Sequence, residues 1–158
     1  MAPENGRDAG PRIAGLAAIV ALVLLAAALC LTRVTDTDLF WHLASGDWIR
    51  RTGEVPRQDL FSYTVPGRPV VEIHWLFQVV LSFIHERGGL PALAVLQTFL
   101  ILGTLGFLVA RARRIAGTNA AVAVMVIAVL AMQERFLMRP EIVSWFLLAV
   151  EPFVVLLL

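Results

Sequence analysis

The chain has 158 residues, of which 59% are hydrophobic and only 16% are charged. Soluble globular domains average about 45–50% apolar and about 25% charged residues, so this composition excludes an ordinary soluble domain. We expect an all-α protein, a polytopic membrane bundle of helices. The formal net charge of +1 gives no reason to expect a nucleic-acid partner, and the single cysteine, Cys30, excludes an intrachain disulfide.

The chain begins with a polar stretch, residues 1–11, which we expect to be a disordered tail. The residues from 13 to 31 carry neither charge nor proline and approach the roughly 20 residues that cross a bilayer, so a first span is predicted over 13–32. A cleaved signal peptide is the alternative, because Arg7 and Arg12 precede the apolar run. That run exceeds the usual apolar region of about 7–15 residues and has no small-x-small cleavage motif, which favours an uncleaved span.

Residues 33–72 form a polar segment that is too long for an ordinary connection and is therefore expected to be a functional external loop. Within it, residues 38–51 place apolar side chains at helical spacing. Trp41 and Trp48 are seven residues apart on one side, which is typical of a helix in the lipid headgroup region. Three prolines and two glycines over residues 52–69 predict an irregular, ordered loop after this helix.

The apolar segment that follows is too short to be an ordinary span. Residues 73–84 would extend about 18 Å as a helix, against a hydrocarbon core of about 30 Å. Such a length favours an interfacial or re-entrant helix, predicted over 73–86. Further spans are predicted over 90–110, 115–133 and 142–158, about four in all. Because the last run stays apolar to the final residue, we expect the fourth span to be truncated and the chain to be a fragment.

The short segment decides which charged groups can meet. If residues 73–86 do not cross, then the arginine cluster at 111–114 lies on the N-terminal side of the membrane. The acids would then converge on the opposite side; they are Asp36, Asp38, Glu72 and Glu141. A crossing would separate Glu141 from the other three. Length favours the non-crossing topology, whereas counting arginines on each side does not settle the orientation.

Asp36 and Asp38 stand at i and i+2 directly after the first span. One interpretation is helix capping, with Asp36 as the N-cap and Asp38 as a first-turn acid favoured by the helix dipole. The other is a carboxylate pair that holds a divalent cation, Mg or Mn, or supplies a general base. His42 lies at i+4 from Asp38, so the two side chains can face each other and the acid could orient the imidazole. The alternative is a solvated or interfacial histidine.

Two further polar groups flank the apolar segments. Glu72 and His74, in "RPVVEIHWL", are either helix-end residues or part of a site. In "QERFLMRPEIVSW", Pro140 fits the first turn of the last helix, with Glu141 beside it.

Arg135 and Arg139 are four residues apart in that second motif and could bind one anionic group. Their alternative is an interfacial loop in which the arginines extend toward water.

The motifs follow a recognisable order along residues 13–158: a span, "DTDLFWHLASGDWIRRTGEVP", a loop, "GRPVVEIHWL", a short apolar helix, two spans and "RFLMRPEIVSWFLLAV". This order resembles the N-terminal part of the polytopic GT-C glycosyltransferases, in particular the protein O-mannosyltransferase and aminoarabinose-transferase type and related bacterial membrane proteins. The resemblance implies a bacterial cytoplasmic (inner) membrane location, with the loop at 33–72 in the periplasm.

The resemblance also implies roles for these residues. Asp36 or Asp38 would match the catalytic acid, as base or metal ligand, and Glu141 the acid of the second external loop. Arg139 would contact the lipid phosphate.

The implied reaction moves a sugar from a polyprenyl-phosphate-linked donor to an acceptor hydroxyl with inversion, among membrane lipids. We further predict Glu72 and His74 as substrate-binding residues, with His42 and Arg135 in support.

A hypothesis from a different class remains beside the transferase. The chain could be a small, non-enzymatic membrane subunit that packs against a larger complex. In that case the acids serve as caps or contact a partner membrane subunit. If it is instead an enzyme fragment, the missing partner is the remaining part of its own chain.

Overall fold

The structure is a computed structural model that describes residues 9–31, 36–64 and 67–155. Over these residues it is helical and contains no β-strand, which confirms the all-α prediction. The elements in chain order are α1 (Ala9–Leu31), α2 (Thr37–Thr52), α3 (Trp75–Ala116), α4 (Thr118–Met132), the short 3₁₀ turn η1 (Gln133–Arg135) and α5 (Pro140–Val155).

The first helix is apolar on all sides, as expected of a membrane span. Leu22, Ala26 and Cys30 are buried along one face, whereas Ile13 and Leu24 on other faces are exposed. The helix begins at Ala9, within the range expected for the disordered tail, and residues 1–8 of that tail lie outside the described residues.

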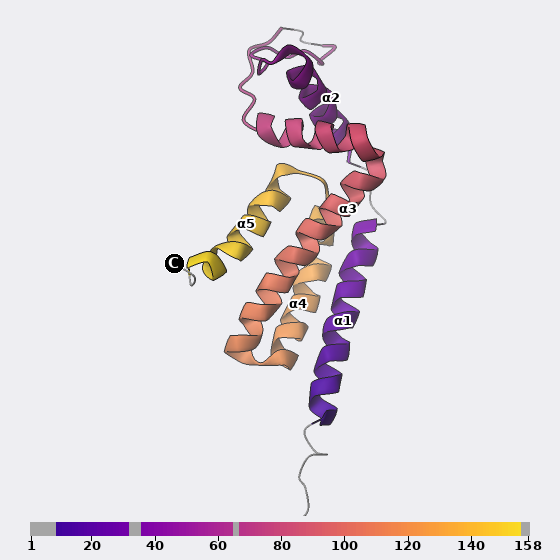
Figure 1. Ribbon diagram of the computed structural model, residues 1–158, viewed down its shortest axis with the longest axis vertical. Coiled ribbons are helices and arrows are strands. Elements are labelled where there is room, and N and C mark those ends of the chain that lie inside the picture. The colour runs from indigo at the N-terminus through magenta and orange to yellow at the C-terminus, as the bar shows by residue number, and fades with distance from the viewer. Residues whose placement is uncertain (1–8, 32–35, 65–66, 156–158) are drawn as a thin grey trace, which may run out of the picture.

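The long helix α3 consists of two arms that meet at Gly89. This glycine has φ 63° and ψ −162°, which a side chain would strain, and Pro91 follows in the first turn of the second arm. We name residues 75–88 the crossing arm and residues 90–116 the bundle arm. Figure 1 shows the crossing arm lying across the end of the bundle beneath α2, while the bundle arm runs alongside α1 and α4. The short helix expected over 73–86 is thus present as the crossing arm.

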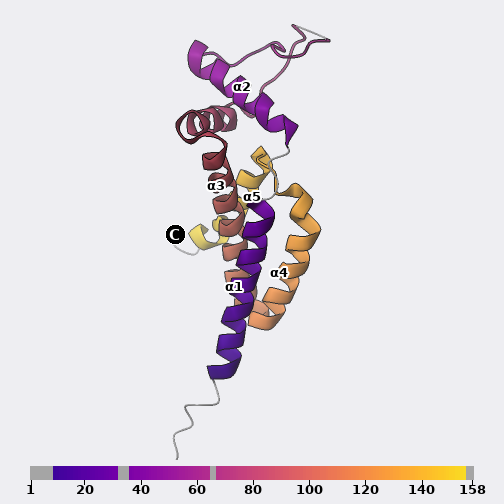
Figure 2. The ribbon, with the colours of Figure 1, turned by 90° about the vertical axis from the view of Figure 1, so that its right-hand side faces the viewer.

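Two apolar clusters hold these parts together. One cluster joins α1, the bundle arm and α4 through side chains that include Ala26, Ile101 and Val129. The other joins α2, both arms of α3 and α5; it includes Leu39, Leu81, Leu93, Met138 and Ile142. Figure 2 shows the same arrangement from the side, with α2 and the crossing arm stacked above the bundle. The second cluster therefore fixes α2 and α5 relative to each other.

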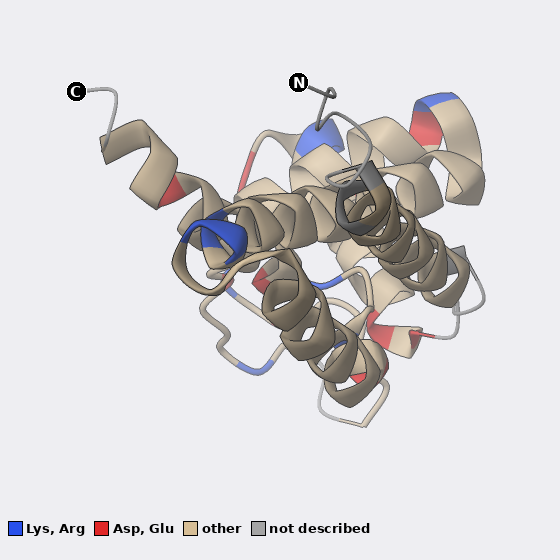
Figure 3. Cartoon of the chain, turned by 90° about the horizontal axis from the view of Figure 1, so that it is seen from below, with Lys and Arg blue, Asp and Glu red and all other residues tan. Residues whose placement is uncertain are grey.

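Within the described residues, three helices are long and apolar enough to cross a membrane. The corresponding stretches are Ile13–Cys30, Trp75–Ala116 and Thr118–Arg135. The last helix, α5, has 16 described residues, and positions 156–158 of the predicted fourth span lie outside the described part of the chain. Figure 3 shows long uncharged stretches of helix, with acidic and basic residues confined to short segments.

The described residues between α2 and α3, 53–64 and 67–74, are irregular but ordered by their own hydrogen bonds, as predicted. The Asp59 carboxylate accepts from the backbone N–H groups of Phe61 and Ser62 at 3.0 and 2.9 Å. An isolated bridge pairs Gln58 with Pro69. This loop brings Glu72 and His74 back toward α2.

Candidate functional site

The site is built on the N-terminus of α2, where Asp36 is the N-cap. Its backbone is extended, with φ −80° and ψ 111°, and its carboxylate accepts from the Asp38 N–H at 3.1 Å. This contact confirms the capping interpretation of the acidic pair. The Asp36 side chain is buried, whereas the Asp38 side chain in the first turn is 54% exposed. Capping therefore accounts for Asp36 and leaves the Asp38 carboxylate open to a ligand.

Arg139 reaches both carboxylates from the segment before α5. Its Nε donates to Asp36 Oδ2 at 2.8 Å, its Nη2 lies 3.2 Å from Asp36 Oδ1, and Nη2 also lies 2.8 Å from Asp38 Oδ2. The Arg139 hydrogen bond holds the pKa of Asp36 below its ordinary value, although burial opposes this shift. The same pairing raises the pKa of Arg139. Asp36 is therefore a charged anchor and a weak base.

Two buried neighbours hold the Arg139 segment in place. Phe136 and Met138 are 4% and 3% exposed. Gln97, buried in the bundle arm, donates from Nε2 to the Phe136 carbonyl at 2.8 Å. Pro140 then opens α5 in the first turn, as its lack of an N–H allows. The guanidinium position is thus set by packing as well as by its ion pairs.

A buried polar group lies on the other side of α2, where it contacts the crossing arm. The Gln78 amide nitrogen donates to Glu72 Oε1 at 2.9 Å and lies 3.3 Å from His42 Nδ1. Burial lowers the pKa of His42, and the nearby His74, whose ring lies edge-on at 6.4 Å, lowers it further. The structure pairs His42 with Gln78, whereas the helical spacing had also allowed a pair with Asp38.

These groups surround an open cleft of about 480 Å³ at one end of the bundle. Its lining includes Asp38, Trp41, His42, His74, Arg139 and Glu141. Five of the predicted site residues therefore share one cleft. Asp36 bonds to Arg139 of the cleft wall, and Glu72 is linked to the cleft through Gln78, which contacts His42.

Arg135 is the exception among the predicted residues. It is exposed in η1 and does not contribute to the cleft lining, so the structure does not bring it to Arg139.

Sequence reasoning missed Gln78 and Ser144. Gln78 is fully buried and links Glu72 to His42, and Ser144 lines the cleft from α5. Gln78 is the one amide side chain in the apolar run that follows His74. Such a residue needs a hydrogen-bond partner when the run is buried, and this is the signal that could have identified it. Ser144 lies three residues after Glu141, on the same helical face.

Arg139 holds three of the four carboxylate oxygens of Asp36 and Asp38 that a divalent cation could use. In the described part of the chain, no group of three or more His, Cys, Asp or Glu side chains is placed to hold a metal ion. Both oxygens of Asp36 already bond to Arg139, and one oxygen of Asp38 does so as well. A cation bound to both acids would have to displace the Arg139 guanidinium. The Mg or Mn site remains a prediction from the sequence.

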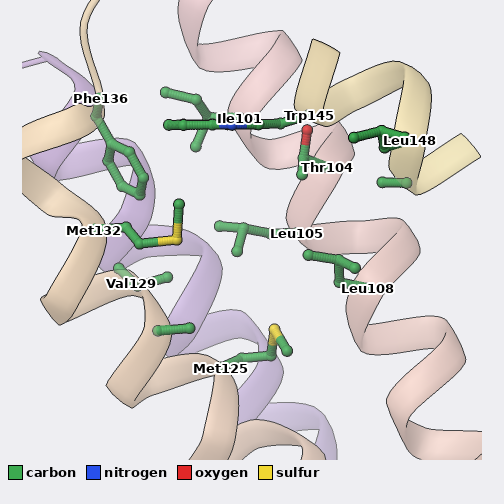
Figure 4. A pocket seen from close by; sticks show the side chains of 12 residues that line it. Ile101, Thr104, Leu105, Leu108, Met125, Val129, Met132, Phe136, Trp145 and Leu148 are labelled. Carbon is green, nitrogen blue, oxygen red and sulfur yellow. The ribbon is translucent and has the colours of Figure 1, made fainter. Parts of the chain in front are cut away.

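A second space in the molecule is an apolar groove that, like the cleft, is lined in part by α5. It has a volume of about 320 Å³ and lies between the bundle arm, α4 and α5. Figure 4 shows Phe136 and Trp145 toward one end of the groove, with Met132, Leu105 and other apolar side chains along it. Because Ser144 lines the cleft and Trp145 lines the groove, neighbouring residues of α5 border both spaces.

Comparison of the chain with protein-family models, with curated protein sequences and with solved structures finds no match.

Proposed function

We propose that the chain is part of a membrane glycosyltransferase that transfers a sugar from a polyprenyl-phosphate-linked donor to an acceptor hydroxyl. The observation that supports this function is that α5 contributes neighbouring residues, Ser144 and Trp145, to the charged cleft and to the apolar groove. A polyprenyl phosphate sugar has a polar head joined to a long hydrocarbon tail. The cleft suits the head and the groove suits the tail, and a single donor could occupy both.

The proposed topology has four crossings: α1, the bundle arm, α4 and α5. The crossing arm lies across the end of the bundle and does not span the membrane. Together with α2 it lies at the external face, which is the periplasmic side of a bacterial inner membrane. The direct contact between Asp36 and Arg139 supports this topology, because residues that touch must lie on the same side. Membrane lipids would surround the exposed apolar faces of the bundle.

Asp38 is the catalytic base in this proposal. It is the more exposed of the two aspartates and lines the cleft, whereas Asp36 is buried and its pKa is lowered by Arg139. The Asp38 carboxylate accepts the proton of the acceptor hydroxyl as that oxygen bonds to the anomeric carbon. The bond from that carbon to the donor phosphate oxygen breaks on the opposite face. Polyprenyl phosphate leaves with the electron pair, and the configuration inverts.

Arg139 and Glu141 complete the head site. A guanidinium suits phosphate oxygens because its N–H groups form a planar fork. Arg139 already balances part of the charge of Asp36 and Asp38, so the donor phosphate would share it with Asp38 at the cleft wall. Glu141, at the first turn of α5, lines the cleft and can accept from sugar hydroxyls.

The test measures donor turnover in membranes that carry the complete protein. The donors are undecaprenyl phosphate-linked mannose, glucose and aminoarabinose, and released undecaprenyl phosphate is quantified by mass spectrometry. We expect Asp38→Asn to lower the rate by about 100-fold or more, because general base catalysis contributes about 10²–10⁴-fold. The matched control is Asp47→Asn on the same helix, whose carboxylate pairs with Arg51 at the surface.

Two results would contradict the proposal. One is an Asp38→Asn variant as active as the Asp47→Asn control. The other is wild-type protein that releases no undecaprenyl phosphate from any of the three donors, a result that favours the non-enzymatic membrane subunit.

A further inference from the structure

Gln78 joins two polar groups at the contact between α2 and the crossing arm. Its side chain is fully buried, and its amide nitrogen is the donor to Glu72 Oε1 at 2.9 Å and to His42 Nδ1 at 3.3 Å. An amide nitrogen carries two hydrogens, so both contacts can be made together. Neither contact belongs to the acid–arginine group on the other side of the cleft.

Glu72 determines which way the Gln78 amide faces. In the reverse orientation the amide oxygen would face the Glu72 carboxylate, and two acceptors would oppose each other. In the orientation seen, the Gln78 carbonyl oxygen is buried and has no hydrogen-bond partner within the described residues. A buried acceptor without a partner is destabilising. The amide therefore keeps this orientation at a cost in stability.

This orientation sets the tautomer of His42. Because Nδ1 accepts from Gln78, the proton of the neutral ring must be on Nε2. Burial and His74 lower the pKa of His42, whereas the negative charges of Glu72, Asp38 and Asp36 raise it and only partly offset burial. The ring is therefore neutral near pH 7 and carries one N–H donor.

The donor nitrogen is not fully enclosed, although His42 as a whole is only 6% exposed. His42 lines the cleft, and its Nε2 has no hydrogen-bond partner within the described chain, yet it is not among the enclosed polar atoms. With Nδ1 occupied and Nε2 protonated, the ring cannot also serve as a base.

We infer that Gln78, oriented by Glu72, is a positioning residue that holds His42 as a neutral Nε2–H donor to a phosphate oxygen of the donor lipid. This inference rests on the proposed function for the identity of the ligand. A neutral donor is suited to this cleft, because Arg139, the one guanidinium among its described lining residues, is already paired with Asp36 and Asp38. The Nε2–H group of His42 adds a hydrogen bond to the leaving phosphate, and no proton is transferred to or from the imidazole ring.

The first experiment determines the tautomer without any ligand. The protein is labelled with ¹⁵N-histidine and placed in lipid nanodiscs, and the ring nitrogen shifts are recorded by NMR from pH 5 to pH 8. The chain has three histidines, so substitution of His85 and His74 in turn assigns the His42 signals. We expect an unprotonated Nδ1 and a protonated Nε2, and a pKa below the ordinary histidine value.

Gln78→Glu combined with Glu72→Gln should invert this pattern, because the carboxylate at position 78 would then accept from the amide at position 72 and from Nδ1–H, and would raise the pKa of His42. If that variant does not fold, Glu72→Gln at the partly exposed end of the network should allow the Gln78 amide to reverse and a second tautomer to appear. The control is Gln133→Glu, which adds a carboxylate outside this contact and should leave the His42 shifts unchanged. A wild-type ring protonated on Nδ1, or a tautomer that is the same in all variants, overturns the inference.

The second experiment adds undecaprenyl phosphate, undecaprenol or inorganic phosphate, with lipid binding measured by native mass spectrometry. We expect the His42 Nε2 shift to move with undecaprenyl phosphate and not with undecaprenol, which has the same tail without the phosphate. A shift with inorganic phosphate alone would assign the site to free phosphate, contradicting a lipid ligand. Bound undecaprenyl phosphate with an unmoved Nε2 overturns the inference while the proposed function stands. Absence of lipid binding contradicts the proposed function and the phosphate contact, but it does not alter the ligand-free tautomer.

Discussion

Arg139 carries an unusual share of the contacts at the cleft. One guanidinium bonds both oxygens of the buried Asp36 and also reaches Asp38, so the N-terminus of α2 depends on a residue of the segment before α5. Asp36 has two functions in this arrangement, because it caps α2 and anchors the arginine. A side chain that is both buried and charged is stable only while its partner remains. The stability of the site should therefore be sensitive to Arg139.

Arg139→Gln should destabilise the fold by about 2–4 kcal/mol, because it leaves the Asp36 carboxylate buried without a counter-charge. Thermal unfolding in detergent can be followed by the reaction of Cys30 with a fluorogenic maleimide, since this single thiol is only 2% exposed in the folded chain.

The matched control is Arg51→Gln, which removes an exposed ion pair with Asp47 and should cost less than about 1 kcal/mol. In an Asp36→Asn background the effect of Arg139→Gln should become much smaller. Equal losses for the two arginine variants would show that the Asp36 pair contributes no more than a surface pair.

At the scale of elements, the contact between α2 and the crossing arm depends on Gly46. A Cβ atom at this position would lie 2.0 Å from the Gln78 carbonyl oxygen of the backbone and 2.5 Å from its carbonyl carbon. The two helices can approach this closely only because Gly46 has no side chain. His42 lies one turn before Gly46, so the same approach brings its ring within hydrogen-bonding distance of Gln78.

Gly46→Ala should therefore separate α2 from the crossing arm and destabilise the fold by about 1–3 kcal/mol, the usual cost of overpacking. Gly106→Ala in the bundle arm is the matched control, because a Cβ there meets no atom within 4 Å. That control should be neutral or stabilising by up to about 1 kcal/mol, since alanine favours a helix over glycine. The Cys30 unfolding assay compares the two. Similar midpoints for both variants would contradict the close contact.

At the scale of the whole molecule, the helices were predictable from the sequence to a greater degree than the contacts between them. Apolar runs and the capping pattern around Asp36 and Pro140 are local signals, and the structure places helix ends at both positions. The convergence of the four acids Asp36, Asp38, Glu72 and Glu141 was predicted only as a consequence of topology. The pairing of Arg139 with Asp36, and of Gln78 with His42, could not be read locally, because each joins residues far apart in sequence through tertiary packing.

The arrangement of the bundle makes a prediction about which loops share a side of the membrane. Cysteines at Tyr63, which is 98% exposed, and at the exposed Arg135 should both react with a membrane-impermeant maleimide in intact cells. A cysteine at Arg114 should react only after the membrane is opened. The background is Cys30→Ala. If the cysteines at Tyr63 and Arg135 react from opposite sides of the membrane, residues 75–88 span it, which contradicts the proposed topology. If the cysteine at Arg114 reacts in intact cells and the other two react only after the membrane is opened, the orientation is the opposite of the one proposed.

The ion pair between Asp36 and Arg139 also has a consequence in time. The two residues are 103 positions apart. At about 5–20 residues per second, synthesis of the chain reaches Arg139 about 5–20 s after Asp36. During this interval α2 has been made, but Arg139, which pairs with its two acids in the described part of the chain, has not, and α5 does not yet exist to line the cleft. The cleft is therefore assembled late in biogenesis, after the first three membrane helices have been made.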